Sequence, residues 1–221
     1  MVHGFSEKSF AFFKELEENN TRDWYNDNKA VFKDHVEAPF VSLLEALTNR
    51  LDGTTLPLIG SKKTMFRLHR DTRFSEDKRP YKTSLGAMLT PSGSKGEASG
   101  LLYLHFASDG GFVASGFYGL SPKQLAPMRQ AMVDRADAFS DVLAHLANAK
   151  RELSTAQTLS SMPRGFSEHA QHQHADMIKL KSLIVTEDLT PAIWTTGDVI
   201  DHAQAMAVDT VPLLKFQKPG V

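Results

Sequence analysis

Residues 101–118 read LLYLHFASDGGFVASGFY, and this stretch decides the fold that we expect. Two runs rich in apolar and aromatic side chains, Leu101–Ala107 and Gly111–Tyr118, flank the turn formers Ser108-Asp109-Gly110. A short turn of this composition between two such runs is typical of a β-hairpin. The sequence therefore predicts two antiparallel strands in the middle of the chain.

Further strand signals lie on both sides of this hairpin. Residues 63–69 alternate in polarity and are one candidate strand. Residues 84–90 are a second candidate strand, and the turn formers of residues 91–100 follow them. Residues 182–187 give a later strand. Neighbouring strands joined by short loops predict a mostly antiparallel sheet.

Helical patterns occupy the two ends of the chain. Ser6 and Thr21 have the positions of helix N-caps before apolar residues at helical spacing, and Ser121-Pro122 with Gln124 forms a possible capping box. Helices first, sheet next and helices last predict an α+β fold, with N-terminal and C-terminal helices packed on the sheet, in a single domain over residues 1–221. The helices expected after these caps and beyond them cover about residues 7–18, 22–36, 39–51, 122–134, 138–153, 174–180 and 197–215.

The composition is ordinary for a globular chain of 221 residues, with 41% apolar and 23% charged residues. Cysteine is absent, which excludes disulfides, thiolate nucleophiles and cysteine-bound zinc. We expect a cytoplasmic protein with no membrane partner, because we find neither a signal-peptide pattern nor a run of about 18 apolar residues. The net charge of −1 argues against coating nucleic acid along its length. Oligomeric state is left open.

Residues 67–82 read RLHRDTRFSEDKRPYK, and in this stretch basic residues outnumber acidic ones, unlike in the chain as a whole. Residues 62–82, which we call the basic segment, hold eight Lys or Arg against three Asp or Glu, whereas the whole chain holds 25 against 26. Planar guanidinium groups match phosphate or carboxylate oxygens in pairs, and Asp side chains can orient them. We therefore expect a small anionic ligand in a basic cleft, bound by Arg67, Arg70, Asp71, Arg73, Asp77, Lys78, Tyr81 and Lys82.

Two alternatives remain open beside this interpretation. The segment can be a structural lattice of Arg–Asp pairs, for example Arg70 with Asp77, that ties a long loop to the sheet without a ligand. It can also be a flat basic face of a non-enzymatic module that docks on an acidic protein surface or on nucleic acid. Because two aspartates cannot neutralise five or six cations, the surplus favours a ligand.

Catalytic and metal signals are weaker. Glu76-Asp77-Lys78 with Asp71 upstream resembles the acids and lysine of a Mg²⁺-dependent nuclease, but the two acidic positions lie close together in a loop. His169, His172 and His174 have a spacing that can bind a transition metal, yet a solvated polar loop explains them better. The sequence predicts no metal site, and it names no catalytic residue, reaction or cofactor.

The basic segment also carries a family resemblance. Its fixed positions are Arg67, Arg70, Asp71, Arg73, Phe74, Asp77, Lys78 and Tyr81. This pattern resembles the signature of the domain-of-unknown-function family 2461, a family of bacterial and fungal conserved hypothetical proteins. Residues 12–29, the hairpin of residues 101–118 and the MPRGF sequence of residues 162–166 are similar to the same family. The resemblance implies a shared fold and a cytosolic bacterial origin, and it implies no activity.

Overall fold

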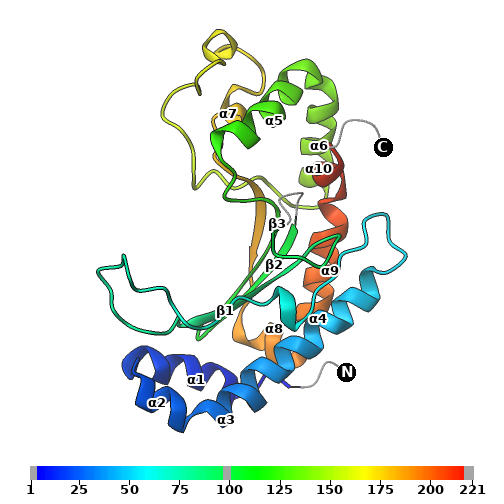
Figure 1. The fold of residues 1–221 in the computed structure, drawn as a ribbon. Helices are drawn as coiled ribbons and strands as arrows, with labels where there is room; N and C mark the ends of the chain where they lie inside the picture. Colours follow the sequence, from blue (N-terminus) through cyan, green and yellow to red (C-terminus); the bar gives the residue numbers. More distant parts are fainter. Residues whose placement is uncertain (1–3, 97–100, 217–221) are drawn as a thin grey trace. The chain divides into compact units, whose positions relative to one another are not determined.

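The structure is a computed structural model that describes residues 4–96 and 101–216, and Figure 1 shows the course of the chain. Helices labelled η are a π-helix (η1) and 3-10 helices (η2 and η3). In chain order the elements are α1 (Glu7–Glu18), α2 (Arg22–Asp27), α3 (Lys29–Phe32), η1 (Lys33–Glu37), α4 (Ala38–Leu51), η2 (Lys62–Thr64), β1 (Ser84–Leu89), β2 (Leu101–Ala107), β3 (Gly110–Phe117), α5 (Pro122–Asp134), α6 (Ala136–Asn148), η3 (Ser167–His169), α7 (Ala175–Ile178), β4 (Leu183–Asp188), α8 (Pro191–Thr196), α9 (Val199–Asp209) and α10 (Val211–Phe216).

The four strands form one antiparallel sheet in the order β1-β2-β3-β4. In the register of β1 with β2, Ser84 lies opposite Ala107 and Leu89 lies opposite Leu102. The predicted hairpin is confirmed, with β2 and β3 joined at Ser108 and Asp109. The α+β class with an antiparallel sheet is likewise confirmed. No helix within residues 4–96 and 101–216 is long and apolar enough to cross a membrane.

Contacts divide the described chain into two compact units. Unit 1 holds residues 4–96, 102–113 and 187–205, and unit 2 holds residues 101, 114–186 and 206–216. The boundaries fall inside β2, β3, β4 and α9, so each of these elements contributes to both units. The expectation of a single domain stays a prediction.

The core of unit 1 lies against one face of β2. Phe106 on this face is fully buried, and its ring centroid lies 4.7 Å from that of Phe5 and 5.8 Å from that of Phe13 in α1. Trp194 of α8 completes the cluster at 4.8 Å. Because side chains alternate across a strand, the neighbouring residues of β2 project from the opposite face.

Unit 2 has its own core between α5, α6 and α10. The ring of Phe139 in α6 lies 5.1 Å from Phe216, and the ring of His174 lies 4.9 Å from Phe139. Arg129 of α5 is only 5% exposed, and its guanidinium donates to the backbone oxygens of Ile178 (2.8 Å) and Leu180 (2.9 Å). These bonds satisfy a buried charge without a carboxylate.

The predicted strand over residues 63–69 is wrong. Ser61 caps the 3-10 helix η2, and a reciprocal bond with Thr64 closes that turn, so the first residues of the stretch are helical. The following residues contact β1 through a bridge of Met65 with Ala87 and a bond from the Phe66 N–H to the Gly86 oxygen, and His69 forms a bridge with Tyr81, which precedes β1. The local cap competes with strand pairing, and the expected alternation of side chains is lost.

Several helix predictions need a change of boundary. The helix expected after Thr21 divides into α2, α3 and the π-helical turn η1, which precedes Pro39. Proline has no N–H to donate, and the wide π turn leads the chain into α4 with Pro39 in its first turn. The helix expected over residues 138–153 is α6 and ends at Asn148, whereas the closing helix divides into α9 and α10 at Thr210. α8 has no counterpart among the helices predicted from the sequence.

Candidate functional site

Within the basic segment, residues 68–70 and 80–82 are joined by backbone hydrogen bonds, and we call these residues the neck. The backbone N–H of Lys82 donates to the oxygen of Leu68 (2.9 Å), and that of Arg70 donates to the oxygen of Pro80 (2.8 Å). Beyond this neck, residues 71–79 contain no helix or strand, and we call them the arginine loop. Two antiparallel backbone bonds therefore hold both ends of the loop together.

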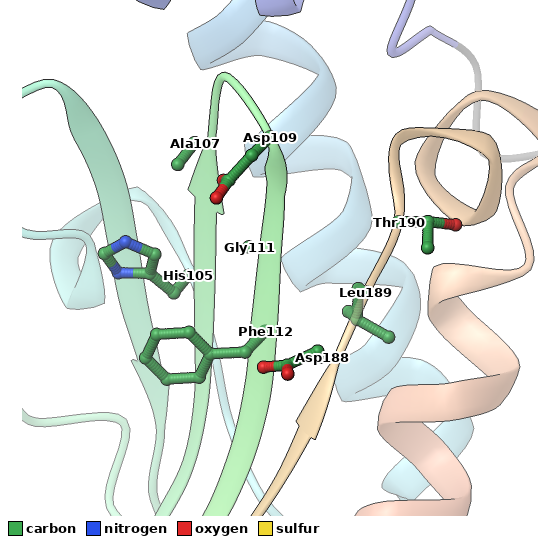
Figure 2. A pocket seen from close by; sticks show the side chains of 8 residues that line it. All are labelled: His105, Ala107, Asp109, Gly111, Phe112, Asp188, Leu189 and Thr190. Carbon is green, nitrogen blue, oxygen red and sulfur yellow. The ribbon is translucent and has the colours of Figure 1, made fainter.

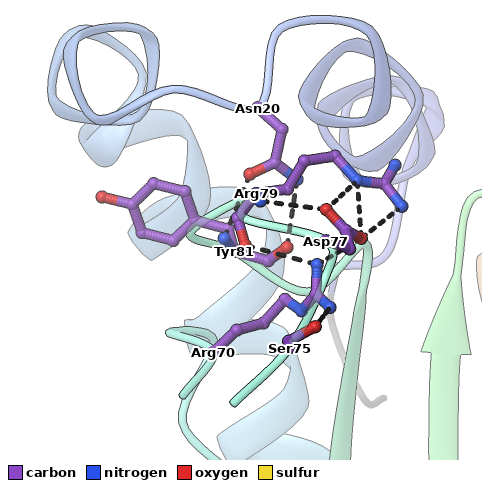
Figure 3. A network of polar contacts seen from close by, with 6 residues as sticks. All are labelled: Asn20, Arg70, Ser75, Asp77, Arg79 and Tyr81. Carbon is purple, nitrogen blue, oxygen red and sulfur yellow. Dashed lines mark hydrogen bonds and ion pairs between the residues drawn. The ribbon is translucent and has the colours of Figure 1, made fainter. Parts of the chain in front are cut away.

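Tyr81 fixes the neck to the helices of unit 1 (Figure 3). The side chain of Asn20 donates to the Tyr81 backbone oxygen and accepts from the Tyr81 N–H, both at 3.0 Å. The Tyr81 ring is 3% exposed and stacks on the ring of Tyr25 in α2 at a centroid distance of 4.3 Å. A side chain placed in this way holds the neck and does not line an open surface.

Asp77 is the centre of the arginine loop (Figure 3). Its carboxylate accepts from Arg70 Nη1 (2.5 Å) and from Arg79 Nε and Nη2 (3.0 and 2.8 Å). Hydrogen bonds from the Arg79 side chain and backbone, and then from Arg70, hold the pKa of Asp77 well below its usual range. Arg70 also donates to the Arg79 backbone oxygen at 3.3 Å. One carboxylate thus gathers two of the cations.

The outer half of the arginine loop contains a second pair. Arg73 Nε and Nη2 donate to the two oxygens of Asp71 at 2.9 and 2.7 Å, and these bonds lower the pKa of Asp71. Lys78 Nζ donates to the Thr72 backbone oxygen at 3.1 Å. Phe74 lies at the tip and is 95% exposed, with the Arg73 guanidinium 5.7 Å from its ring. The tip of the loop therefore exposes the Phe74 ring next to the ion pair of Arg73 with Asp71.

Arg67 and Lys82 differ from these residues because neither has a carboxylate partner within residues 4–96 and 101–216. Lys82 Nζ lies 5.6 Å from the ring of Phe66, and Lys95 Nζ lies 5.9 Å from the same ring. Burial and then the nearby charge of Arg67 lower the pKa of Lys82. The charge of Arg67 thus acts on Lys82, and it also contributes, after the bonds from Arg73, to the low pKa of Asp71.

Arg67 also lines a cleft of about 250 Å³ in unit 1. Glu37 and Lys62 form a salt bridge of 2.6 Å among the lining residues. Burial, with smaller effects of Tyr81 and Glu37, raises the pKa of Tyr25 on the same cleft. The cleft is lined by Tyr25, Phe32, Glu37, Lys62, Met65, Phe66, Arg67, Leu68, His69 and Leu85.

The residues expected to bind a ligand thus divide into three places. Arg70 and Asp77 meet inside the arginine loop, Asp71, Arg73 and Lys78 lie along its outer part, and Tyr81 is buried in the neck. Arg67 and Lys82 remain at the sheet edge. Sequence reasoning did not find several partners of these residues. Arg79 follows Asp77 by two positions and could have been found, and Phe66 lies in the basic segment itself, whereas Asn20 and Lys95 reach the segment only through the fold.

His169, His172 and His174, whose spacing suggested a metal site, have rings that lie well apart. Their ring centroids lie 6.1 Å (His169–His172) and 5.6 Å (His172–His174) apart. His174 is buried, and its Nε2 lies 2.8 Å from the Ala136 backbone oxygen and 3.2 Å from Ser140 Oγ. Within the described residues no group of three or more His, Asp or Glu side chains is arranged to hold a metal ion.

Comparison with known proteins places the chain in a family. No curated protein and no solved structure matches the chain. The model of the family described as conserved hypothetical protein (DUF2461) matches residues 8–216, which include the N-terminal helices, the sheet and the whole basic segment. The chain therefore belongs to the domain-of-unknown-function family 2461.

Proposed function

We propose that the protein binds a small ligand that carries a phosphate or carboxylate group, and that Arg67 and Lys82 contact this group. One observation carries the proposal. Arg67 lines a cleft and forms no salt bridge among the described residues, whereas Arg70, Arg73 and Arg79 of the same segment each form a salt bridge with an aspartate. A guanidinium without a partner at a concave surface is suited to bidentate contact with an anion.

The electrostatics of the two cations support the same proposal. Burial lowers the pKa of Lys82 most, and the charge of Arg67 lowers it further, so the two cations repel each other. An anion between them removes this repulsion and gains charge-assisted hydrogen bonds. The repulsion between these two cations therefore favours binding of an anion.

The remaining residues have a supporting role in this proposal. Arg70 and Asp77, together with Asp71, Arg73 and Lys78, set the shape of the arginine loop. Tyr81 with Asn20 fixes the neck from which Lys82 projects. Preorganisation of this kind lowers the entropy lost when a ligand binds.

Isothermal titration of the full chain with inorganic phosphate, ribose 5-phosphate and citrate tests the proposal. We expect Arg67→Gln to weaken binding of the best ligand roughly tenfold to a hundredfold, the usual value of a charge-assisted hydrogen bond. Lys63→Gln is the matched control, because Lys63 is exposed in η2 and does not line the cleft. Unchanged affinity in Arg67→Gln, or equal losses in both variants, would falsify the proposal.

A second candidate function is docking on an acidic protein surface through the tip of the arginine loop. Phe74 favours it, because a large aromatic ring that is 95% exposed is a typical anchor at protein interfaces. Arg73 and Arg79 of the same loop are exposed as well, with exposed side-chain fractions of 76% and 52%. A fluorescent peptide of alternating Glu and Leu is the probe. Binding should fall in Phe74→Ser and persist in Arg67→Gln, and the reverse order would exclude docking through this tip.

A further inference from the structure

A strip of aromatic rings lies on the face of β2 that points away from the core of unit 1. Phe66, Tyr103, His105 and Phe112 form this aromatic strip. Ring centroids lie 6.1 Å apart for Phe66 and Tyr103, and 5.8 Å apart for Tyr103 and Phe112. His105 and Phe112 stack at 4.7 Å with only 13° between their planes. Each of the four side chains keeps part of its surface exposed.

Gly86 makes room for the strip. It lies opposite His105 in the register of β1 and β2, and a Cβ at this position would lie 2.3 Å from the Tyr103 hydroxyl oxygen. The absence of a side chain lets Tyr103 lie over β1, where its hydroxyl is 3.1 Å from His105 Nδ1. The rings are therefore held by the sheet and by one another.

A hollow of about 460 Å³ borders the far end of the strip (Figure 2). His105 and Phe112 line it together with the carboxylates of Asp109 and Asp188, and the turn at Thr190 closes another side. Neither carboxylate has a hydrogen bond or ion pair to any of the residues that the structure describes. The volume falls in the range of small-molecule pockets.

The two ends of the strip have opposite charge. Lys82 and Lys95 lie over Phe66 at one end, whereas Asp109 and Asp188 line the hollow together with Phe112 at the other. His105 lies between them. Burial lowers its pKa most, while the charge of Asp109 raises that pKa and the charge of Lys82 lowers it. A ligand that covers the whole strip therefore needs an anionic end, an aromatic body and an end that donates hydrogen bonds.

We propose that the ligand of the anion site is a nucleoside phosphate, with its phosphate at Arg67 and Lys82 and its base against Phe112. This inference rests on the proposed function of Arg67 and Lys82. A base is planar and stacks on an aromatic ring, and its N–H groups can donate to Asp109 or Asp188. Guanine presents two N–H groups side by side, which suits a carboxylate, whereas uracil presents one between two acceptors. A free nucleotide and the end of a single strand offer the same unit.

The test compares ligands that differ by the base alone. Isothermal titration of the full chain with GMP, UMP and ribose 5-phosphate should show GMP binding about tenfold more tightly than ribose 5-phosphate, and more tightly than UMP. Phe112→Leu keeps an apolar side chain and should bring GMP down to the affinity of ribose 5-phosphate. Tyr118→Leu, which removes an exposed ring outside the strip, is the control and should change neither affinity.

The outcomes separate this inference from the function on which it rests. If GMP and ribose 5-phosphate bind equally and Arg67→Gln loses both, the nucleoside inference is overturned and anion binding stands. If neither binds, both are overturned. Unchanged binding of ribose 5-phosphate by Phe112→Leu shows that this variant is folded. If the folded variant still binds GMP more tightly than ribose 5-phosphate, the inference is also overturned. A 5′-phosphorylated dinucleotide that competes as well as GMP identifies the end of a strand as the source, and one that fails to compete identifies a free nucleotide.

Discussion

Asp77 in the arginine loop joins two arginines. It receives bonds from both Arg70 and Arg79, and its pKa is well below the usual range of an aspartate. A folded-state pKa below the unfolded value, which is about 3.9, stabilises the fold above that value. This stabilisation is lost as the pH falls from the unfolded value through the folded one.

We therefore expect Asp77→Asn to lower the urea midpoint of unfolding at pH 7 and to lower it less at pH 3. Urea titrations followed by circular dichroism at the two pH values measure the difference. Asp71→Asn is the matched control, because Asp71 accepts from Arg73 alone and should matter less. An equal loss at both pH values would show that the charge of Asp77 does not stabilise the fold.

The sequence shows which residues carry charge, but it does not predict which of them form ion pairs with one another. The pairing of Arg70 with Asp77 follows from their closeness in the chain and is found in the structure. That Arg79 turns back onto the same carboxylate depends on the curvature of the arginine loop. The contact of Asn20 with Tyr81 joins positions 61 residues apart, and no local pattern contains it.

At the scale of elements, prediction succeeded where one local signal dominated. Ser121 with Gln124 forms the capping box that begins α5, and the turn at Asp109 joins β2 to β3. It failed for residues 63–69, where apolar alternation suggested a strand and the cap at Ser61 decided for η2. The sequence does alternate in polarity here, but the hydrogen bonds of the Ser61 side chain favour the helical turn over strand pairing.

At the scale of the whole molecule, we expect one cooperative unfolding transition in calorimetry. Because β2, β3, β4 and α9 each contribute residues to both units, neither unit has a complete set of its own elements. Phe13→Leu in unit 1 and Phe139→Leu in unit 2 should each lower the same melting temperature, roughly by a few degrees. Two transitions, each moved by one substitution alone, would show that the units unfold separately and that the single-domain prediction is wrong.

The irregular course of residues 59–66 has a consequence for the behaviour of the protein in concentrated solution. β1 is the first strand of the sheet, and its outer edge is met by single backbone contacts at Ile59 and at residues 65 and 66. A regular strand in this place would offer its own free row of N–H and C=O groups to another molecule. The short helix η2, with exposed Lys62 and Lys63, covers the edge without offering such a row. The same residues that failed to form a strand thus oppose edge-to-edge aggregation.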